Sequence, residues 1–328
     1  AITPFNAPVN LLVQKVAPAI AAGNAVVDKP APAGTRTALR LAELFQAAGW
    51  PDGLFNVVTG DRAAALAVSA HPDVRAVSFT GGTAAGEALA RAAGAKKFLA
   101  ELGSNAANIV LADADLSAAA AKIARAGFEA SGQQCISAQR VLVDRAVLAA
   151  FTPLFVEAVA GLRVGPVADA ATDIGPMVSF AAADRVSAMV QDAVVHGAEL
   201  LLAPRREGAL LSPAILLNVP AEARLWREEA FGPVVAIVPF DGIDQAIALA
   251  NDSPFGLQGA VFTNNLAHAF RFSEEFEVGS LWVNEASRFR LDMYPFGGVK
   301  QSGVGREGVR YAIEELSQIK FTGIRLTA

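Results

Sequence analysis

The stretch Ala76-Val-Ser-Phe-Thr-Gly-Gly-Thr-Ala-Ala-Gly86 sets the architecture expected of this chain. Its first four residues form an apolar run that predicts a strand over 76–79. Two glycines follow, and helical periodicity then extends from Thr83 to Ala93. A strand that passes through a glycine turn into a helix is the repeating unit of a parallel α/β sheet.

The same alternation continues on both sides of this unit. Apolar periodicity predicts helices over 8–23, 36–48 and 62–69, and strands over 25–28, 54–58 and 97–102. Strands separated by helices imply right-handed crossovers and a mostly parallel, doubly wound sheet. The carboxyl ends of such strands form a ligand crevice.

A second α/β region follows residue 102. Helices are predicted over 115–130, 145–161, 180–196, 242–251 and 265–276, and strands over 140–143, 234–239, 259–263 and 280–284. We therefore predict an α/β fold with two doubly wound-type domains. The predicted boundaries are 1–103 and 104–317, with a separate terminal segment over 318–328.

The composition indicates a globular protein with a small ligand. With 32 acidic and 27 basic residues spread without long blocks, the chain has no electrostatic footprint for nucleic acid or an anionic membrane. Three histidines without ligand spacing predict no metal site. One cysteine cannot form an internal disulfide, and no apolar stretch is long enough to span a bilayer, so we expect a cytoplasmic enzyme.

The single cysteine lies between a predicted helix and a predicted strand, in Ser131-Gly-Gln-Gln-Cys-Ile-Ser-Ala-Gln-Arg140. Polar and small residues surround Cys135, whereas a cysteine that packs as a small hydrophobe normally lies within an apolar run. This setting favours a reachable thiol. A buried and inert cysteine is the competing interpretation, and the stretch alone leaves both open.

Two features indicate a ligand site at the strand ends. The glycines of 78–86 let the backbone turn tightly and let a phosphate approach the N-terminus of the next helix. Because the pattern is not the GxGxxG fingerprint, a purely geometric role for these glycines is the alternative. Lys29 follows a predicted strand and can bind a ribose hydroxyl or a phosphate, or it can lie in solvent at a loop start.

Carboxylates end two further segments. Glu101 closes the strand over 97–102, where a neighbouring apolar run would raise its pKa and suit it to act as a general base near neutral pH. A surface carboxylate at a strand end is the alternative. Glu228 and Glu229 precede a turn that can aim one of them at the sugar of a ligand, with the other in solvent.

Seven motifs in this order resemble the aldehyde dehydrogenase superfamily. They are Thr3-Pro-Phe-Asn-Ala-Pro8, Lys29-Pro-Ala31, Phe79-Thr-Gly81, Glu101-Leu-Gly103, Gly132-Gln-Gln-Cys135, Glu229-Ala-Phe-Gly-Pro233 and Pro295-Phe-Gly-Gly-Val-Lys-Gln-Ser-Gly303. Each motif is short, but the ordered set covers nearly the whole chain. The resemblance implies NAD(P)-dependent, non-acylating oxidation of a small aldehyde to a carboxylic acid.

The resemblance also implies roles for individual residues. Cys135 matches the nucleophile that forms a thiohemiacetal and then a thioester, and Glu101 matches the base that activates the hydrolytic water. Asn6 and the backbone N–H of Cys135 match the groups that hold the oxyanion. A CoA-acylating relative, in which CoA takes the acyl group, is a weaker alternative because Glu101 is present.

Residues 1–103 would then be the C-terminal part of the NAD(P)-binding domain, and 104–317 the catalytic domain. The positions that match the cofactor site are Lys29, Gly81, Gly82, Gly86, Glu229 and Phe231. Many members carry a glutamate three residues after the lysine, where this chain has Pro32. A 2′-phosphate would meet no carboxylate there, so both NAD and NADP stay open.

The substrate site is expected in the stretch 284–296, which matches a loop at the substrate entrance of relatives. Arg288 and Arg290 can bind an anionic aldehyde, or they can be surface arginines paired with Glu285 and Asp292. Phe296, in the Phe-Gly-Gly turn that follows, is a further candidate for the substrate pocket.

The stretch Lys320-Phe-Thr-Gly-Ile-Arg-Leu326, close to the end of the sequence, is typical of an edge strand. Relatives use such a strand for subunit pairing, so a homodimer or homotetramer is expected. Family members usually carry roughly a further third of a chain before the motif at Thr3. We therefore expect this sequence to lack part of the cofactor domain, and an inactive fragment is the alternative to a working enzyme.

Overall fold

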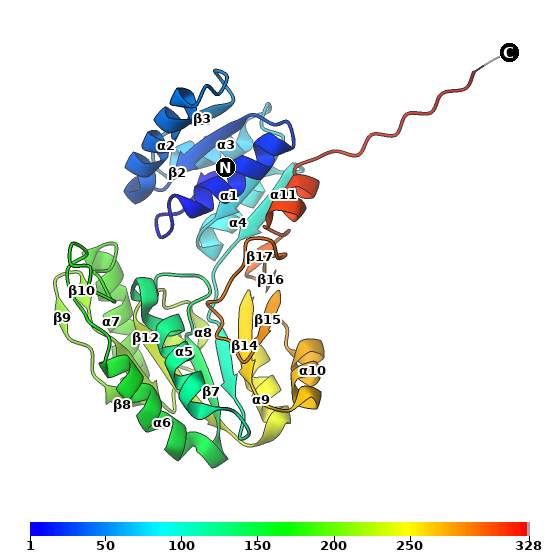
Figure 1. The fold of residues 1–328 in the computed structure, drawn as a ribbon. Coiled ribbons are helices and arrows are strands. Elements are labelled where there is room, and N and C mark those ends of the chain that lie inside the picture. The colour runs from blue at the N-terminus through cyan, green and yellow to red at the C-terminus, as the bar shows by residue number, and fades with distance from the viewer. Residues whose placement is uncertain (327–328) are drawn as a thin grey trace.

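The computed structural model describes residues 1–326, which form two α/β lobes (Figure 1). The N-terminal lobe, blue to cyan, contains a six-stranded sheet of order β17-β5-β4-β1-β2-β3. Its strands are β1 (Ile2–Thr3), β2 (Val26–Pro30), β3 (Phe55–Val57), β4 (Ala76–Thr80), β5 (Lys97–Glu101) and β17 (Gly303–Val304). All pairs are parallel except β17 with β5.

Helices cover this sheet at the predicted places. They are α1 (Asn10–Ala21), α2 (Thr35–Ala47), α3 (Arg62–Ala70) and α4 (Thr83–Ala93), with a 3₁₀ turn, η1 (Pro32–Gly34), before α2. Helix α3 packs on α4, and α1 packs on α11 (Val309–Glu315). Helix α4 follows the glycine turn with the bounds that the periodicity predicts.

The C-terminal lobe contains a seven-stranded sheet of order β15-β14-β6-β7-β12-β11-β8. Its strands are β6 (Ala107–Val110), β7 (Arg140–Asp144), β8 (Glu199–Leu202), β11 (Ala214–Leu217), β12 (Val234–Phe240), β14 (Gln258–Phe262) and β15 (Ser280–Val283). Only β8 runs antiparallel to its neighbour. The centre of β7, Val141 to Val143, is fully buried, as in parallel strands that are covered on both faces.

The remaining elements surround this second sheet. They are α5 (Leu116–Phe128), η2 (Glu129–Gly132), α6 (Arg145–Ala160), α7 (Phe180–Val195), α8 (Arg224–Arg227), α9 (Gly242–Asn251) and α10 (Leu266–Glu275). Two small ribbons pair β9 (Arg206–Glu207) with β10 (Leu210–Leu211), and β13 (Phe255–Gly256) with β16 (Val299–Lys300). The predicted two-lobed, mostly parallel α/β fold is thus confirmed.

The division of the chain differs from the predicted one. Strand β17 pairs with β5, and α11 packs on α1, so the segment from 303 to 315 belongs to the N-terminal lobe. The prediction had assigned it to the second domain, 104–317. The sequence pattern cannot show that the chain returns to the N-terminal sheet at β17. This strand is two residues long and pairs with a strand about 200 residues earlier.

Several short strands and the terminal segment differ from the elements that periodicity indicates. Sequence periodicity missed β1, β6, β8 and β11, which are two to four residues long. Residues 320–326 form no strand within this chain, so the expected pairing of this segment with another subunit stays a prediction, and the last two residues of the predicted segment 318–328 lie outside the described residues. Among residues 1–326, no helix is long and apolar enough to span a membrane.

Candidate active site

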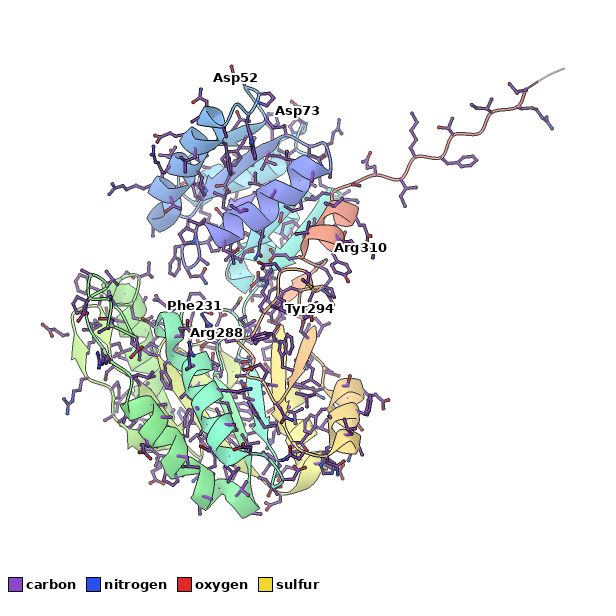
Figure 2. The ribbon with its side chains drawn as sticks, viewed as in Figure 1. Asp52, Asp73, Phe231, Arg288, Tyr294 and Arg310 are labelled. Carbon is purple, nitrogen blue, oxygen red and sulfur yellow. The ribbon has the colours of Figure 1, made fainter. Side chains whose placement is uncertain are left out.

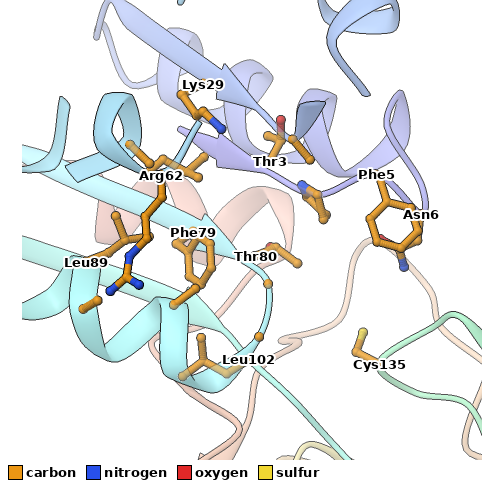
Figure 3. A pocket seen from close by; sticks show the side chains of 18 of the residues that line it. Thr3, Phe5, Asn6, Lys29, Arg62, Phe79, Thr80, Leu89, Leu102 and Cys135 are labelled. Atoms are coloured by element: carbon orange, nitrogen blue, oxygen red, sulfur yellow. The ribbon is translucent and has the colours of Figure 1, made fainter. Parts of the chain in front are cut away.

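A cleft of about 510 Å³ lies between the two lobes. The strand register explains its position, since Lys29 pairs with Ile2, and Thr80 pairs with Glu101, at one carboxyl edge of the N-terminal sheet. The predicted residues that line the cleft are Asn6, Lys29, Gly81, Gly82, Cys135, Glu229 and Phe231. Figure 3 shows Asn6 and Phe5 on one side of this cleft and Cys135 opposite them.

Cys135 is presented by a tight backbone reversal after α5. Ala130, Ser131 and Gly132 have φ values of 53°, 58° and 66°, which turn the chain out of the helix. A Cβ on Gly132 would lie 2.2 Å from the carbonyl oxygen of Gly232, so only glycine fits there. The thiol is therefore held at the cleft by a turn that joins α5 to β7.

Glu101 lies directly against the thiol. The Sγ–H of Cys135 donates to Oε1 of Glu101, whose side chain is only 2% exposed. Burial, reinforced by the charge of Glu307, raises the pKa of Glu101 to about 7. Burial and the neighbouring Glu101 carboxylate also raise the pKa of the Cys135 thiol well above its usual range. The thiol thus keeps its proton at neutral pH and donates it in a hydrogen bond to a carboxyl group whose own pKa is about 7.

The second oxygen of Glu101 has no hydrogen-bond partner among residues 1–326. An ionised carboxylate accepts several hydrogen bonds, so this oxygen can accept a proton from a water or another donor in the cleft. The surrounding charge is set by a buried cluster behind Glu101, in which Lys15 pairs with Glu307 at 2.7 Å and Arg290 pairs with Glu307 at 3.1 Å.

Asn6 is brought to the nucleophile across the two lobes. Its Nδ2 donates to the backbone oxygen of Gln133 at 2.9 Å, two residues before Cys135. Asn6 and Gln133 are 127 positions apart in the sequence, and the sequence cannot show that they meet. A primary amide nitrogen carries two hydrogens, so one remains for a ligand oxygen when the other holds Gln133.

Lys29 and the glycine turn lie at the other end of the cleft. Lys29 is 5% exposed, and burial lowers the pKa of its ammonium group. A Cβ on Gly81 would meet the Phe79 ring at 2.5 Å, whereas one on Gly82 would meet nothing within 4 Å. Gly82 precedes the N-terminus of α4, where free N–H groups favour an anion.

Gly86 does not line the cleft, in contrast to its predicted approach to a pyrophosphate. It is buried, and a Cβ there would lie 2.4 Å from Cδ2 of Leu102. The position is therefore small because α4 packs closely over Leu102. This is the geometric interpretation that the sequence left open for the glycines.

Glu229 and Phe231 border the cleft from the C-terminal lobe. Oε1 of Glu229 accepts from the backbone N–H of Ser104 at 3.0 Å, and burial raises the pKa of this carboxyl to about 7. Phe231 has a φ of 44°, an uncommon conformation for a residue with a Cβ, and its ring meets that of Phe5 edge-on. Arg185, which the sequence analysis missed, lines the cleft beside them.

The predicted substrate residues lie outside the lining of this cleft. Arg288 pairs with Glu129 at 2.9 Å, and Arg290 with Glu307 and with Oε1 of Gln14. The expected partners, Glu285 and Asp292, instead contact Lys122 and Gln14. The arginines are thus paired, but with residues distant in sequence that local spacing could not identify.

Phe296 lies beside the nucleophile although it does not line the cleft. It is 2% exposed and packs with Ile136, Leu257 and Cys135. The guanidinium of Arg290 lies over its ring at 3.9 Å from the centroid. Phe296 therefore forms an apolar wall behind the thiol.

Arg62 is the cleft residue that sequence reasoning missed most clearly. It is the first residue of α3, and its side chain extends across the cleft towards Leu89 on α4 (Figure 3). An apolar slot formed by Ala65, Leu66, Ala85, Ala88 and Leu89 lies between these two helices. No motif contains Arg62, so the fold alone reveals it.

These observations agree with comparisons to known proteins. The family model described as the aldehyde dehydrogenase family matches residues 1–322, and the chain therefore belongs to this family. The 3-sulfolactaldehyde dehydrogenase of Priestia aryabhattai is 46% identical over 327 residues, which cover 99% of this chain and 69% of that protein. The sulfoacetaldehyde dehydrogenase of Neptuniibacter caesariensis is 41% identical, over 97% of this chain and 70% of its own length.

Solved structures show the same fold. An NAD-dependent aldehyde dehydrogenase from Sinorhizobium meliloti superposes with a TM-score of 0.94 at 38% identity, covering 97% of this chain and 64% of that one. The NADP complex of an NADP-dependent glyceraldehyde-3-phosphate dehydrogenase from Bacillus halodurans also gives 0.94, at 36% identity, covering 97% and 67%. The chain thus spans about two thirds of the length of these relatives.

Proposed function

We propose that this chain carries the catalytic centre of an aldehyde dehydrogenase that oxidises a small aldehyde to a carboxylic acid. The observation that carries the proposal is the direct contact between the Cys135 thiol and the Glu101 carboxyl, with the Asn6 amide held beside them. A nucleophile in contact with a base of pKa about 7, at a cleft between two α/β lobes, is suited to covalent catalysis.

In the first step, Glu101 takes the thiol proton and the thiolate adds to the aldehyde carbon. A bond forms between sulfur and carbon, and the carbonyl electron pair moves to oxygen. Asn6 Nδ2 and the backbone N–H of Cys135 stabilise this oxyanion. Ile136 is buried and Cys135 is partly buried, so few waters compete for the oxyanion. The two hydrogen bonds therefore stabilise the negative charge more strongly than they would in water.

A nicotinamide dinucleotide fits the rest of the cleft. The apolar slot between α3 and α4 suits a flat heterocycle, and the open surface at Gly82 before α4 suits a phosphate. Lys29 would hold the ribose, while Glu229 and Phe231 would hold the nicotinamide end. When bound, this cofactor supplies the hydride acceptor for the oxidation.

Glu101 then serves the hydrolysis of the thioester on Cys135. Once it has released the thiol proton to solvent, Glu101 removes a proton from water, the resulting hydroxide adds to the acyl carbon, and the carbon–sulfur bond breaks to release the carboxylic acid and the Cys135 thiolate. The oxygen of Glu101 that lacks a partner is available for this water. The same contact argues against a CoA-acylating enzyme, because a base beside the thioester favours water as the acceptor.

We further propose that the cofactor site accepts NADP as well as NAD. Pro32 lines the cleft near Lys29 and provides no carboxylate that would repel a 2′-phosphate. Arg62 adds a cation to the same end of the cleft and has no ion-pair partner within residues 1–326. Asp61 and Asp28 partly offset the charge of Lys29, so the proposed preference for the extra phosphate of NADP rests mainly on Arg62.

The aldehyde is proposed to be small and polar. Relatives at 39–46% identity act, by their names, on sulfolactaldehyde, sulfoacetaldehyde and lactaldehyde. Glu129 and Glu307 already neutralise much of the charge of Arg288 and Arg290, so we assign neither arginine as a dedicated anion site. Pairing of subunits through the exposed apolar residues of the terminal segment, such as Ile319 and Phe321, stays a proposal.

The test is a turnover assay with the unchanged chain and Cys135→Ser. Each is mixed with NAD or NADP and with short aldehydes, and absorbance of the reduced nicotinamide is followed, with and without CoA. Turnover that is lost in Cys135→Ser and unchanged by CoA supports the proposal. A CoA requirement, or equal turnover by both chains, would refute it.

A further inference from the structure

We infer that Gln139 is a positioning residue that fixes the cofactor side of the site; this inference rests on the proposed function. It is 5% exposed, lies immediately before β7, and its side chain reaches the segment before Phe231. Nε2 donates to the backbone oxygens of Leu225 at 3.2 Å and Glu228 at 2.8 Å. Oε1 accepts from the backbone N–H of Ala230 at 2.8 Å.

The segment that Gln139 holds is irregular and depends in part on side-chain hydrogen bonds. Residues 228–233 form neither helix nor strand, and although Glu228, Gly232 and Pro233 make backbone hydrogen bonds, the groups around Glu229 and Ala230 bond to side chains. Arg185 binds the carbonyl oxygens of Glu229 and Ala230, and Gln139 binds the groups on either side of Glu229. These contacts keep a buried carboxylate in place and hold Phe231 at a positive φ.

Gln139 also links this segment to the nucleophile. It lies four residues after Cys135 in the same short connection between η2 and β7. This side chain therefore connects the segment that carries the thiol to the residues proposed to hold the nicotinamide end. Loss of this link would loosen Glu229 and Phe231 without touching Glu101 or Asn6.

A second buried glutamine acts on the opposite loop and serves as a matched control. Gln258 is 2% exposed, and its Nε2 donates to the backbone oxygens of Ser287 and Phe289. The Ser287 hydroxyl donates to the oxygen of Ile136, the residue after Cys135. Figure 2 shows Phe231 and Arg288, which belong to the two held segments, near the junction of the lobes.

Methionine keeps the length of a glutamine side chain and removes its hydrogen bonds. We expect this replacement to affect cofactor binding at position 139 and aldehyde binding at position 258. Gln139→Met leaves the N–H of Ala230 and the oxygen of Glu228 without their partner, so the Glu229 segment relaxes. We expect cofactor affinity to fall about 10-fold, with the aldehyde KM within about 2-fold of the unchanged chain. Gln258→Met is expected to raise the aldehyde KM and to leave cofactor affinity within about 2-fold.

The experiment titrates each 328-residue chain with NAD and NADP by protein fluorescence and measures both KM values with one short aldehyde. Urea midpoints show whether the two variants lose similar stability. If Gln139→Met does not fold, Gln139→Asn, which shortens the side chain by one methylene, replaces it with the same expected direction. The inference is supported if Gln139→Met weakens cofactor binding alone and Gln258→Met raises the aldehyde KM alone.

Equal losses for both ligands in both variants would overturn the inference and leave the proposed function intact. Unchanged cofactor affinity in Gln139→Met would do the same. Absence of cofactor binding by the unchanged chain would instead overturn the proposed function, and this inference with it.

Discussion

Replacing Glu307 by glutamine is expected to lower the pKa of Glu101. Glu307 is 12% exposed and lies with Glu101 around one small buried cavity. Burial alone would raise the pKa of Glu307, but Lys15 and Arg290 outweigh burial and hold this pKa below its usual value. Glu307 is therefore charged at neutral pH, and its charge opposes ionisation of Glu101.

The size of the effect follows from burial and charge. A like charge in the same buried region, at an effective dielectric constant of about 20, contributes about 2 kcal/mol, and one pKa unit corresponds to about 1.4 kcal/mol. Lys15 and Arg290 remain in the variant and also lower the pKa of Glu101. Burial, the largest cause of the raised pKa, is unchanged, so we expect a fall of about one unit from about 7.

The assay is the pH dependence of kcat under conditions where thioester hydrolysis limits the rate. Glu101 acts as a base only when ionised, so the rate rises with pH through its pKa. In Glu307→Gln this rise should move to lower pH by about one unit. Glu314→Gln, on the exposed face of α11, is the control and should leave the profile in place. An unchanged or upward shift in Glu307→Gln would refute the electrostatic argument.

Three further predictions concern packing, buried polarity and cofactor choice. Gly86→Ala should destabilise the fold by about 1–3 kcal/mol because the new Cβ would lie 2.4 Å from Leu102. Gly82→Ala is the control, since its Cβ would meet nothing within 4 Å, and it should change thermal stability by less than about 1 kcal/mol. Equal melting temperatures for the two variants would contradict this prediction. Arg140→Met should cost about 3–5 kcal/mol in urea unfolding, because this fully buried guanidinium donates to the backbone oxygens of Asn105, Leu249, Ala250 and Asp252. A loss below about 1 kcal/mol would show that water replaces it. Arg62→Gln should lower the ratio of kcat/KM for NADP to kcat/KM for NAD about 10-fold. The control, Arg91→Gln on α4, should leave this ratio unchanged. A constant ratio in Arg62→Gln would exclude Arg62 from the phosphate site.

Much of the candidate site could be predicted residue by residue from motifs. The strand-turn-helix unit at 76–93 has the bounds that periodicity indicates, because an apolar run and a glycine turn are local signals. The matches to the family placed Cys135, Glu101 and Asn6 among the residues of interest. The structure adds that the thiol and the carboxyl touch and that Asn6 reaches the same segment.

The partners of the charged residues could not be predicted. The sequence suggested neighbours for Arg288 and Arg290 a few positions away, yet their carboxylates come from η2 and from the segment before α11. Salt bridges between segments depend on how distant elements pack, and the spacing of residues along the sequence does not indicate this packing. For the same reason, Gly86 was assigned to a ligand although Leu102 occupies the space above it.

The sequence by itself therefore determined the alternation of strands and helices, the two-lobed α/β class and the residue types available for covalent chemistry. These follow from periodicity, turn residues and motifs, which act over a few residues. Only the tertiary structure decided which of these residues meet. Strand β17 returns from position 303 to pair beside Glu101, and burial in that position gives this carboxyl a pKa of about 7. Burial and contact depend on the whole packed chain, and they set the chemistry of a site whose members lie far apart in sequence.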